Sequence, residues 1–181
     1  VNNPLGLEQL PTSGTSTSIE VKVNVGKPTI GDFTYRSGPG LYLSDTQTQS
    51  GFGDSTTSNL EFFIGHTDTE LTGGKFSVMA YKSTGGGNFR SAGIFSAADV
   101  WAFGSTVTLK VTYRGLVSGN HRYECFYNVG AGDVSIGSLD FAVRLPFAGP
   151  FVSYSYYSGA VTADVPDWAE FDNFFPVPTA L

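Results

Sequence analysis

Thr106–Arg114 reads TVTLKVTYR, and this stretch decides the fold class. Its apolar residues recur at every second position, Val107, Leu109, Val111 and Tyr113, with polar residues between them. Strict alternation is typical of a β-strand that buries one face and exposes the other. The stretch Ile19–Val25 alternates in the same way. We therefore expect antiparallel sheets in which one face is buried and the other is exposed.

Further strand candidates follow at intervals of roughly ten residues, separated by glycine-rich turn signals such as Gly85-Gly86-Gly87. They are Gly40–Ser44, Leu60–His66, Lys75–Lys82, Phe89–Phe95, Arg122–Val129, Val134–Phe141, Phe151–Tyr157 and Trp168–Val177. A single segment, Ser96–Phe103, looks helical, because Ser96 is a suitable N-cap and Asp99 stands where a capping-box acid belongs. The sequence predicts an all-β, two-sheet antiparallel sandwich of about ten strands.

Composition indicates one globular domain. The chain has 181 residues, of which 14% are charged, 14% are aromatic and 23 are glycine. This composition excludes disorder, a coiled coil and a helical bundle. We expect residues 1–18 to form an extended lead-in or linker, residues 19–177 the sandwich domain, and residues 178–181 a tail.

The charge pattern excludes some partners. Ten Lys and Arg residues, scattered singly, stand against 16 Asp and Glu residues. We therefore expect no nucleic acid and no membrane insertion, since neither a basic patch nor a run of about 18 apolar residues occurs. The single cysteine, Cys125, permits no internal disulfide, and its apolar neighbours predict a buried thiol.

The chain begins at Val1 and shows no signal-peptide pattern, which we interpret as a mature product or an excised module. A Ser/Thr/Gly-rich, Lys-poor composition favours an extracellular or cell-surface location.

The order of segments TSIEVKVNV, SNLEFFIGH, GKFSVMAYK, STVTLKVTYRG and GPFVSYSYYSG, closed by AEFDNF at Ala169–Phe174, supports a family resemblance. Over Thr17–Val177 the chain resembles the concanavalin A-like lectin/glucanase superfamily, in particular its laminin-G-like jelly-roll modules. The resemblance implies a jelly-roll sandwich that binds glycans on a concave face or a rim of loops. It also implies a structural calcium ion, with Asp172 and an acidic partner such as Glu20 or Asp32 as ligands.

Catalytic motifs are incomplete. Glu170 and Asp172 would share a strand face, as in the Glu-x-Asp-x-x-Glu pattern of the β-glucanases, but the position of the second glutamate is Phe175. A polysaccharide lyase would need a Tyr or His base and an Arg, Gln or Asn to neutralise a uronate. The chain offers the fragments Asn88-Phe89-Arg90 and Tyr81-Lys82. We therefore expect no enzyme.

Aromatic side chains are the candidates for ligand binding, because rings stack on the apolar faces of sugars. Tyr154 and Tyr156 would form a ladder on one strand face, as a sugar platform or as part of the core. The other candidates lie near predicted strand ends or loops: Trp101, Trp168, Tyr42, Tyr81 and Arg90.

The sequence thus predicts a non-catalytic secreted or cell-surface module that binds polysaccharide or mediates adhesion. The alternative is a self-associating structural subunit of an extracellular assembly such as a surface layer, sheath, appendage or capsid decoration. A polysaccharide lyase or glycosidase is a lesser alternative. Glycan binding and the mass in solution distinguish the first two hypotheses.

Overall fold

A computed structural model describes residues 8–9, 16–23, 38–46, 57–65, 75–86, 90–95, 101–102, 106–153 and 169–176. All regular structure in these ranges is strand, which confirms the all-β prediction. The strands are β1 Glu8–Gln9, β2 Ser16–Val23, β3 Gly38–Ser44, β4 Ser58–Gly65, β5 Lys75–Thr84, β6 Ala92–Phe95, β7 Trp101–Ala102, β8 Thr106–Val117, β9 Asn120–Asn128, β10 Val134–Phe141, β11 Phe147–Ser153 and β12 Ala169–Pro176. No helix in these ranges is long and apolar enough to cross a membrane.

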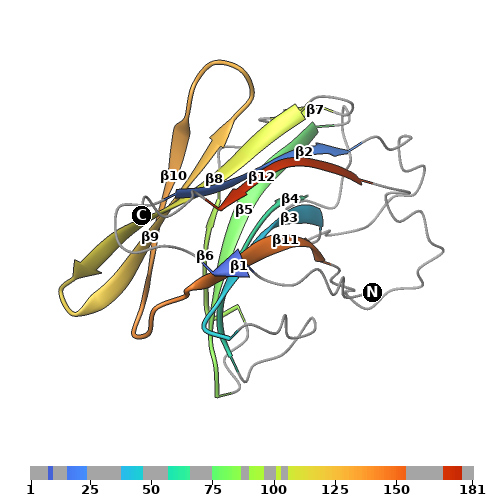
Figure 1. Cartoon of the computed structure of the whole chain (residues 1–181). Helices are drawn as coiled ribbons and strands as arrows, with labels where there is room; N and C mark the ends of the chain where they lie inside the picture. The colour runs from blue at the N-terminus through green and yellow to red at the C-terminus, as the bar shows by residue number, and fades with distance from the viewer. Residues whose placement is uncertain are drawn as a thin grey trace, which may run out of the picture.

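The described strands form two antiparallel sheets that lie in two layers (Figure 1). The seven-stranded sheet has the order β1-β11-β3-β4-β5-β6, with β7 also paired to β5. The five-stranded sheet has the order β10-β9-β8-β2-β12. The predicted two-sheet antiparallel sandwich is therefore confirmed.

The core lies between the two sheets and follows the alternation in the sequence. Val107, Leu109 and Val111 of β8 are at most 1% exposed and pack in one cluster with residues of β3, β4 and β5. Cys125 lies in the same cluster at 0% exposure, as predicted, and burial raises the pKa of its thiol well above the ordinary range. This thiol is therefore a small core side chain and not a reactive group.

Two elements differ from the predictions. The expected helix over Ser96–Phe103 is wrong at Trp101–Ala102, which form strand β7 and pair with Lys75–Phe76; the rest of that segment lies outside the described residues. A single helical turn forms few backbone hydrogen bonds of its own, whereas pairing with β5 gives the backbone N–H and C=O groups hydrogen-bond partners.

Strand structure also begins before Ile19, inside the segment expected to be a lead-in. Glu8–Gln9 pair with β11, and Ser16–Ser18 pair with Lys110–Thr112 of β8.

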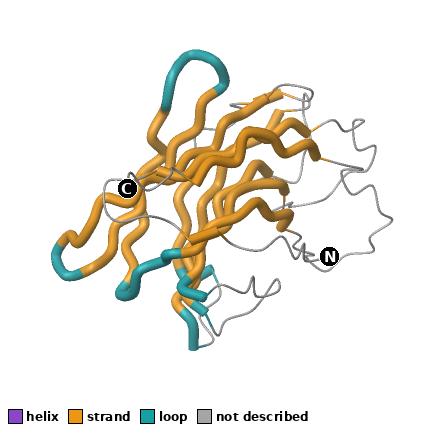
Figure 2. The backbone as a smooth tube through the Cα atoms, viewed as in Figure 1, coloured by secondary structure: helices purple, strands orange, loops and turns teal. Residues whose placement is uncertain are grey.

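Short turns connect β8 to β9 and β9 to β10 in the five-stranded sheet, and Figure 2 shows them as teal loops between orange strands. Ser118 and Gly119, between β8 and β9, have φ angles of 52° and 82°. Two consecutive residues with positive φ are the geometry of a type I′ hairpin turn, which suits the twist of the flanking strands. This turn keeps β8 and β9 in register for most of their length.

Candidate functional site

Three side chains form a row across the outer face of the seven-stranded sheet, the face turned away from the other sheet. Tyr42 of β3 lies directly opposite Glu61 of β4, and Glu61 lies directly opposite Tyr81 of β5. Directly paired residues on one sheet face have Cβ atoms about 5 Å apart, so neighbouring side chains interact. The row therefore places one carboxyl group between two phenols.

Two further rows flank this one. Ser44, Asn59 and Ser83 pair in register on one side, and Phe63 pairs with Met79 on the other. Tyr42, Phe63, Met79 and Tyr81 pack together in a cluster separate from the main core. We use the name outer-face cluster for Tyr42, Asn59, Glu61, Phe63, Met79, Tyr81, Ser83 and Arg90.

Arg90 completes the cluster from the segment that leads into β6. Its Nε and Nη2 atoms both donate to Oε2 of Glu61, at 2.9 and 2.7 Å. The Arg90 and Glu61 side chains are 9% and 6% exposed, so the ion pair is buried. Charge-assisted hydrogen bonds of this kind are short and strong in a low-dielectric setting.

Aromatic rings and backbone geometry fix the Arg90 guanidinium in place. It lies 4.6 Å from the Tyr81 ring centroid and 5.2 Å from that of Phe63, within the range of cation–π contacts. The Arg90 backbone has a φ of 44°, which is unusual for a residue other than glycine, and its N–H donates to Oγ of Ser83 at 3.0 Å. Left-handed non-glycine residues occur often at functional sites, where surrounding contacts hold them.

Burial dominates the electrostatics of Glu61. Loss of solvent raises the pKa of its carboxyl, while the charge of Arg90 and the hydrogen bonds from it act in the opposite direction. A carboxyl with a raised pKa beside a fixed guanidinium and a phenol is an arrangement found in acid–base sites.

Asn59 adds an amide to the same face. The residue is 3% exposed, and its Nδ2 atom donates to the backbone oxygen of Thr57 at 3.4 Å. Its Oδ1 atom is buried and accepts no hydrogen bond in the described structure. A buried acceptor without a donor is costly, and a bound hydroxyl group would satisfy it.

The structure brings together Tyr42, Tyr81 and Arg90 out of the seven predicted ligand-binding residues. Trp101 lies on β7, at the edge of the same sheet, and its side chain is outside the described structure. Tyr154, Tyr156 and Trp168 also lie outside the described residues.

Sequence reasoning missed Glu61 and Asn59. The signal was present in β4, where Asn59, Glu61 and Phe63 alternate with Leu60, Phe62 and Ile64. Both sets are buried, so the alternation does not resemble that of a strand with one exposed face.

The structure describes two of the three predicted calcium ligands, Asp172 and Glu20. Asp172 on β12 lies directly opposite Glu20 on β2, and Asp32 is outside the described residues. The described ranges contain no group of three His, Cys, Asp or Glu residues that would hold a metal ion. Calcium binding at Asp172 stays a prediction.

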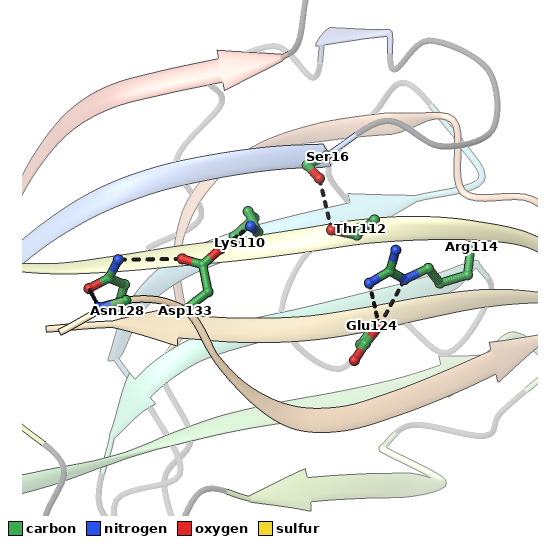
Figure 3. A network of polar contacts seen from close by, with 8 residues as sticks. Ser16, Lys110, Thr112, Arg114, Glu124, Asn128 and Asp133 are labelled. Atoms are coloured by element: carbon green, nitrogen blue, oxygen red, sulfur yellow. Dashed lines mark hydrogen bonds and ion pairs between the residues drawn. The ribbon is translucent and has the colours of Figure 1, made fainter. Parts of the chain in front are cut away.

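The outer face of the five-stranded sheet carries paired charges (Figure 3). Lys110 pairs with Asp133, and Arg114 donates to Glu124 at 2.8 Å. These contacts, with the hydrogen bond of 2.8 Å between Ser16 and Thr112, are partly exposed. Exposed pairs of this kind stabilise little and do not shape a site.

Comparisons with known proteins give structural likeness alone. No family model matches the chain, and a search of curated proteins returned no match. Among solved structures, the chain is similar to alginate lyase Aly36B bound to alginate trisaccharide, with 14% identity, a TM-score of 0.46, and coverage of 95% of this chain and 72% of that one. It is similar to the same lyase bound to alginate tetrasaccharide, with 12% identity, a TM-score of 0.46, and coverage of 95% and 71%. The lyase itself aligns at 15% identity with a TM-score of 0.43, and coverage of 90% and 68%.

These comparisons correct the functional expectation. The expected non-catalytic binding or structural module, and with it the absence of enzymatic activity, is contradicted, because the solved structures that match are those of an enzyme. At this level of identity the likeness concerns the fold, and a functional argument has to come from the side chains.

Proposed function

We propose that this chain is a polysaccharide lyase that cleaves uronate-containing polysaccharides at the outer-face cluster. The observation that carries the proposal is the position of the Arg90 guanidinium, 4.6 Å from the Tyr81 ring and hydrogen-bonded to Glu61 on the same sheet face. A uronate lyase needs a cation to neutralise the sugar carboxylate and a side chain to transfer a proton. Arg90 and Tyr81 are of the required types.

The reaction would be a β-elimination. Tyr81, reacting as its phenolate, takes the proton from the ring carbon that bears the carboxylate, and Arg90 stabilises the negative charge that develops there. The bond between the adjacent ring carbon and the glycosidic oxygen then breaks, a double bond forms between the two ring carbons, and the Tyr81 phenol passes the abstracted proton to the leaving oxygen. Glu61 holds the guanidinium in place, and the amide oxygen of Asn59 accepts a hydrogen bond from the sugar.

The burial of the cluster supports this electrostatic role. Glu61, Tyr81 and Tyr42 are at most 5% exposed, so their charges and dipoles act in a low dielectric.

The geometry does not favour hydrolysis. A retaining glycosidase needs two carboxyl groups about 5–5.5 Å apart, and an inverting one needs two at a larger separation. The three rows of the outer face hold one carboxyl group, that of Glu61.

Placement in the concanavalin A-like superfamily belongs to the same proposal and is supported by the sandwich topology.

The test is product analysis. The protein is incubated with alginate, with a galacturonan and with a neutral β-glucan, and the products are separated and weighed by mass spectrometry. A lyase gives unsaturated oligosaccharides, lighter by one water than hydrolysis products, from a uronate polymer and none from the glucan. Saturated products from any polymer would contradict the proposal.

A further inference from the structure

A second group of polar side chains lies away from the outer-face cluster, with Tyr113 on β8, His121 on β9 and Arg144 in the segment between β10 and β11. The Tyr113 hydroxyl and Nδ1 of His121 are 2.6 Å apart, and the two rings stack with centroids 5.7 Å apart. The guanidinium carbon of Arg144 lies 5.5 Å from the Tyr113 ring centroid. We use the name end cluster for Tyr113, His121 and Arg144.

A β-bulge places His121 beside Tyr113. The register between β8 and β9 shifts between Tyr113 and Gly115, where Gly115 has a φ of 84°, and His121 then lies opposite Leu116. An extra residue at a bulge turns a strand and redirects the side chains beyond it. The local backbone thus produces the contact between the phenol and the imidazole.

A buried hydroxyl fixes the backbone next to Arg144. Leu145, which is 1% exposed, donates its N–H to the Tyr123 oxygen at 2.6 Å. Burial raises the pKa of Tyr123 to about 12, so its hydroxyl stays protonated at neutral pH. Tyr123 lies directly opposite Tyr113 and contacts its ring at 5.1 Å. Arg144 is therefore held close to Tyr113 before any ligand arrives.

The chemistry of the end cluster suits an anion. Nδ1 of His121 is engaged by Tyr113, which leaves Nε2 as the nitrogen that meets a ligand, and the described structure gives Nε2 no hydrogen bond. The His121 and Arg144 side chains are partly exposed. A guanidinium presents a planar fork of donors that matches a carboxylate. Exposed apolar side chains flank these groups: Leu116, 66% exposed, lies directly opposite His121, and Val143, 43% exposed, precedes Arg144 in the chain.

We propose that the end cluster is a second binding site, which takes the carboxylate of a sugar acid. Arg144 and Nε2–H of His121 donate to the carboxylate, and the exposed aliphatic side chains contact the sugar ring. This site is independent of catalysis at the outer-face cluster, since it uses neither Tyr81 nor Arg90.

The experiment is a titration with D-glucuronate, followed by the NMR signal of the His121 imidazole. His66 is the other histidine in the sequence, and the His66→Gln variant leaves a single imidazole signal. D-glucose, which has the same ring without the charge, is the ligand control. Arg144→Gln tests the site, and Arg114→Gln, which removes the same charge from the outer face, is the matched variant.

We expect a saturable shift of the His121 signal with glucuronate and none with glucose. Arg144→Gln is expected to weaken glucuronate binding at least about tenfold, whereas Arg114→Gln leaves it within about twofold. Tyr81→Phe leaves it unchanged, which separates this site from the proposed active site. Absence of a saturable shift, an equal response to glucose, or unchanged affinity in Arg144→Gln would overturn the proposal.

Discussion

At the scale of single residues, the Arg90–Glu61 pair determines the properties of the outer face. Transfer of both charges out of water is costly, and their mutual attraction offsets that cost only while both partners are present. The pKa of Glu61 is raised because the cost of burying its carboxylate exceeds the stabilisation that Arg90 provides. A site that keeps an expensive pair beside two phenols is better explained by function than by stability.

Removal of Arg90 leaves Glu61 buried without its cation. We expect Arg90→Met to lower the free energy of unfolding by about 3–5 kcal/mol at neutral pH, because an uncompensated charge is left in the interior. Urea unfolding measures this loss. Arg114→Met is the control, since its pair with Glu124 is 49% and 24% exposed and is worth about 0–1 kcal/mol. Equal losses in the two variants would contradict the buried pair.

Glu61 should also make stability depend on pH. Its pKa in the folded protein lies above the ordinary value of 4.5, so the folded state holds this proton more tightly than the unfolded chain. The stabilisation is complete below the ordinary value and is lost as pH rises through the raised pKa. We therefore expect the urea midpoint of the wild type, relative to that of Glu61→Gln, to decrease as the pH rises from the ordinary pKa of glutamate to the raised pKa of Glu61. A difference that rises with pH would show that the pKa is lowered.

At the scale of elements, the register of β3, β4 and β5 brings the site together. Tyr42 and Tyr81 were predicted as separate strand residues, and their common row with Glu61 depends on long-range pairing that local patterns do not encode. The strands themselves were predictable from alternation, since β8 follows it throughout its buried face. Trp101–Ala102 were not, because pairing with β5 outweighs local helical signals there.

Gly40 sets the close approach of β3 to β4. An added Cβ at this position would clash with the backbone oxygen of Phe62 and would lie 2.6 Å from Cβ of Phe63. Backbone cannot yield cheaply, so we expect Gly40→Ala to destabilise the fold by about 1–3 kcal/mol. Hydrogen exchange should accelerate first at the β3 and β4 amides. Gly119→Ala is the comparison variant: its φ is strained for alanine, but an added Cβ meets no neighbouring atom. We expect hydrogen-exchange protection of the β3 and β4 amides to be unchanged in this variant.

At the scale of the whole molecule, two unequal sheets share one core and the larger sheet carries a second buried layer on its outer face. The core between the sheets was predictable from composition and alternation. The buried layer on the outer face was not, because the neighbours Phe62 and Phe63 are equally buried, although Phe62 belongs to the core and Phe63 to the outer face.

Cys125 reports on opening of this core. Its side chain is fully buried in β9, between β8 and β10, so a thiol reagent reaches it only when the sandwich opens. We expect modification in native buffer to be slow and to accelerate with urea in proportion to the fraction of open molecules. Tyr123→Phe, which loses the hydroxyl bonded to Leu145, should speed it. Rapid modification of the native wild type would contradict the buried position.

The central claim is that the outer-face cluster performs elimination on a uronate polymer. The most direct measurement is the rise in ultraviolet absorbance from the double bond formed, recorded on alginate and on a galacturonan for the wild type, Tyr81→Phe, Arg90→Lys and Arg114→Gln. We predict a steady rise for the wild type and for Arg114→Gln on at least one polymer. The rate should fall by at least about 100-fold in Tyr81→Phe, the loss expected when a proton-transfer group is removed, and also in Arg90→Lys. Folded Tyr81→Phe and Arg90→Lys proteins with wild-type rates, or a wild type inactive on both polymers, would contradict the claim.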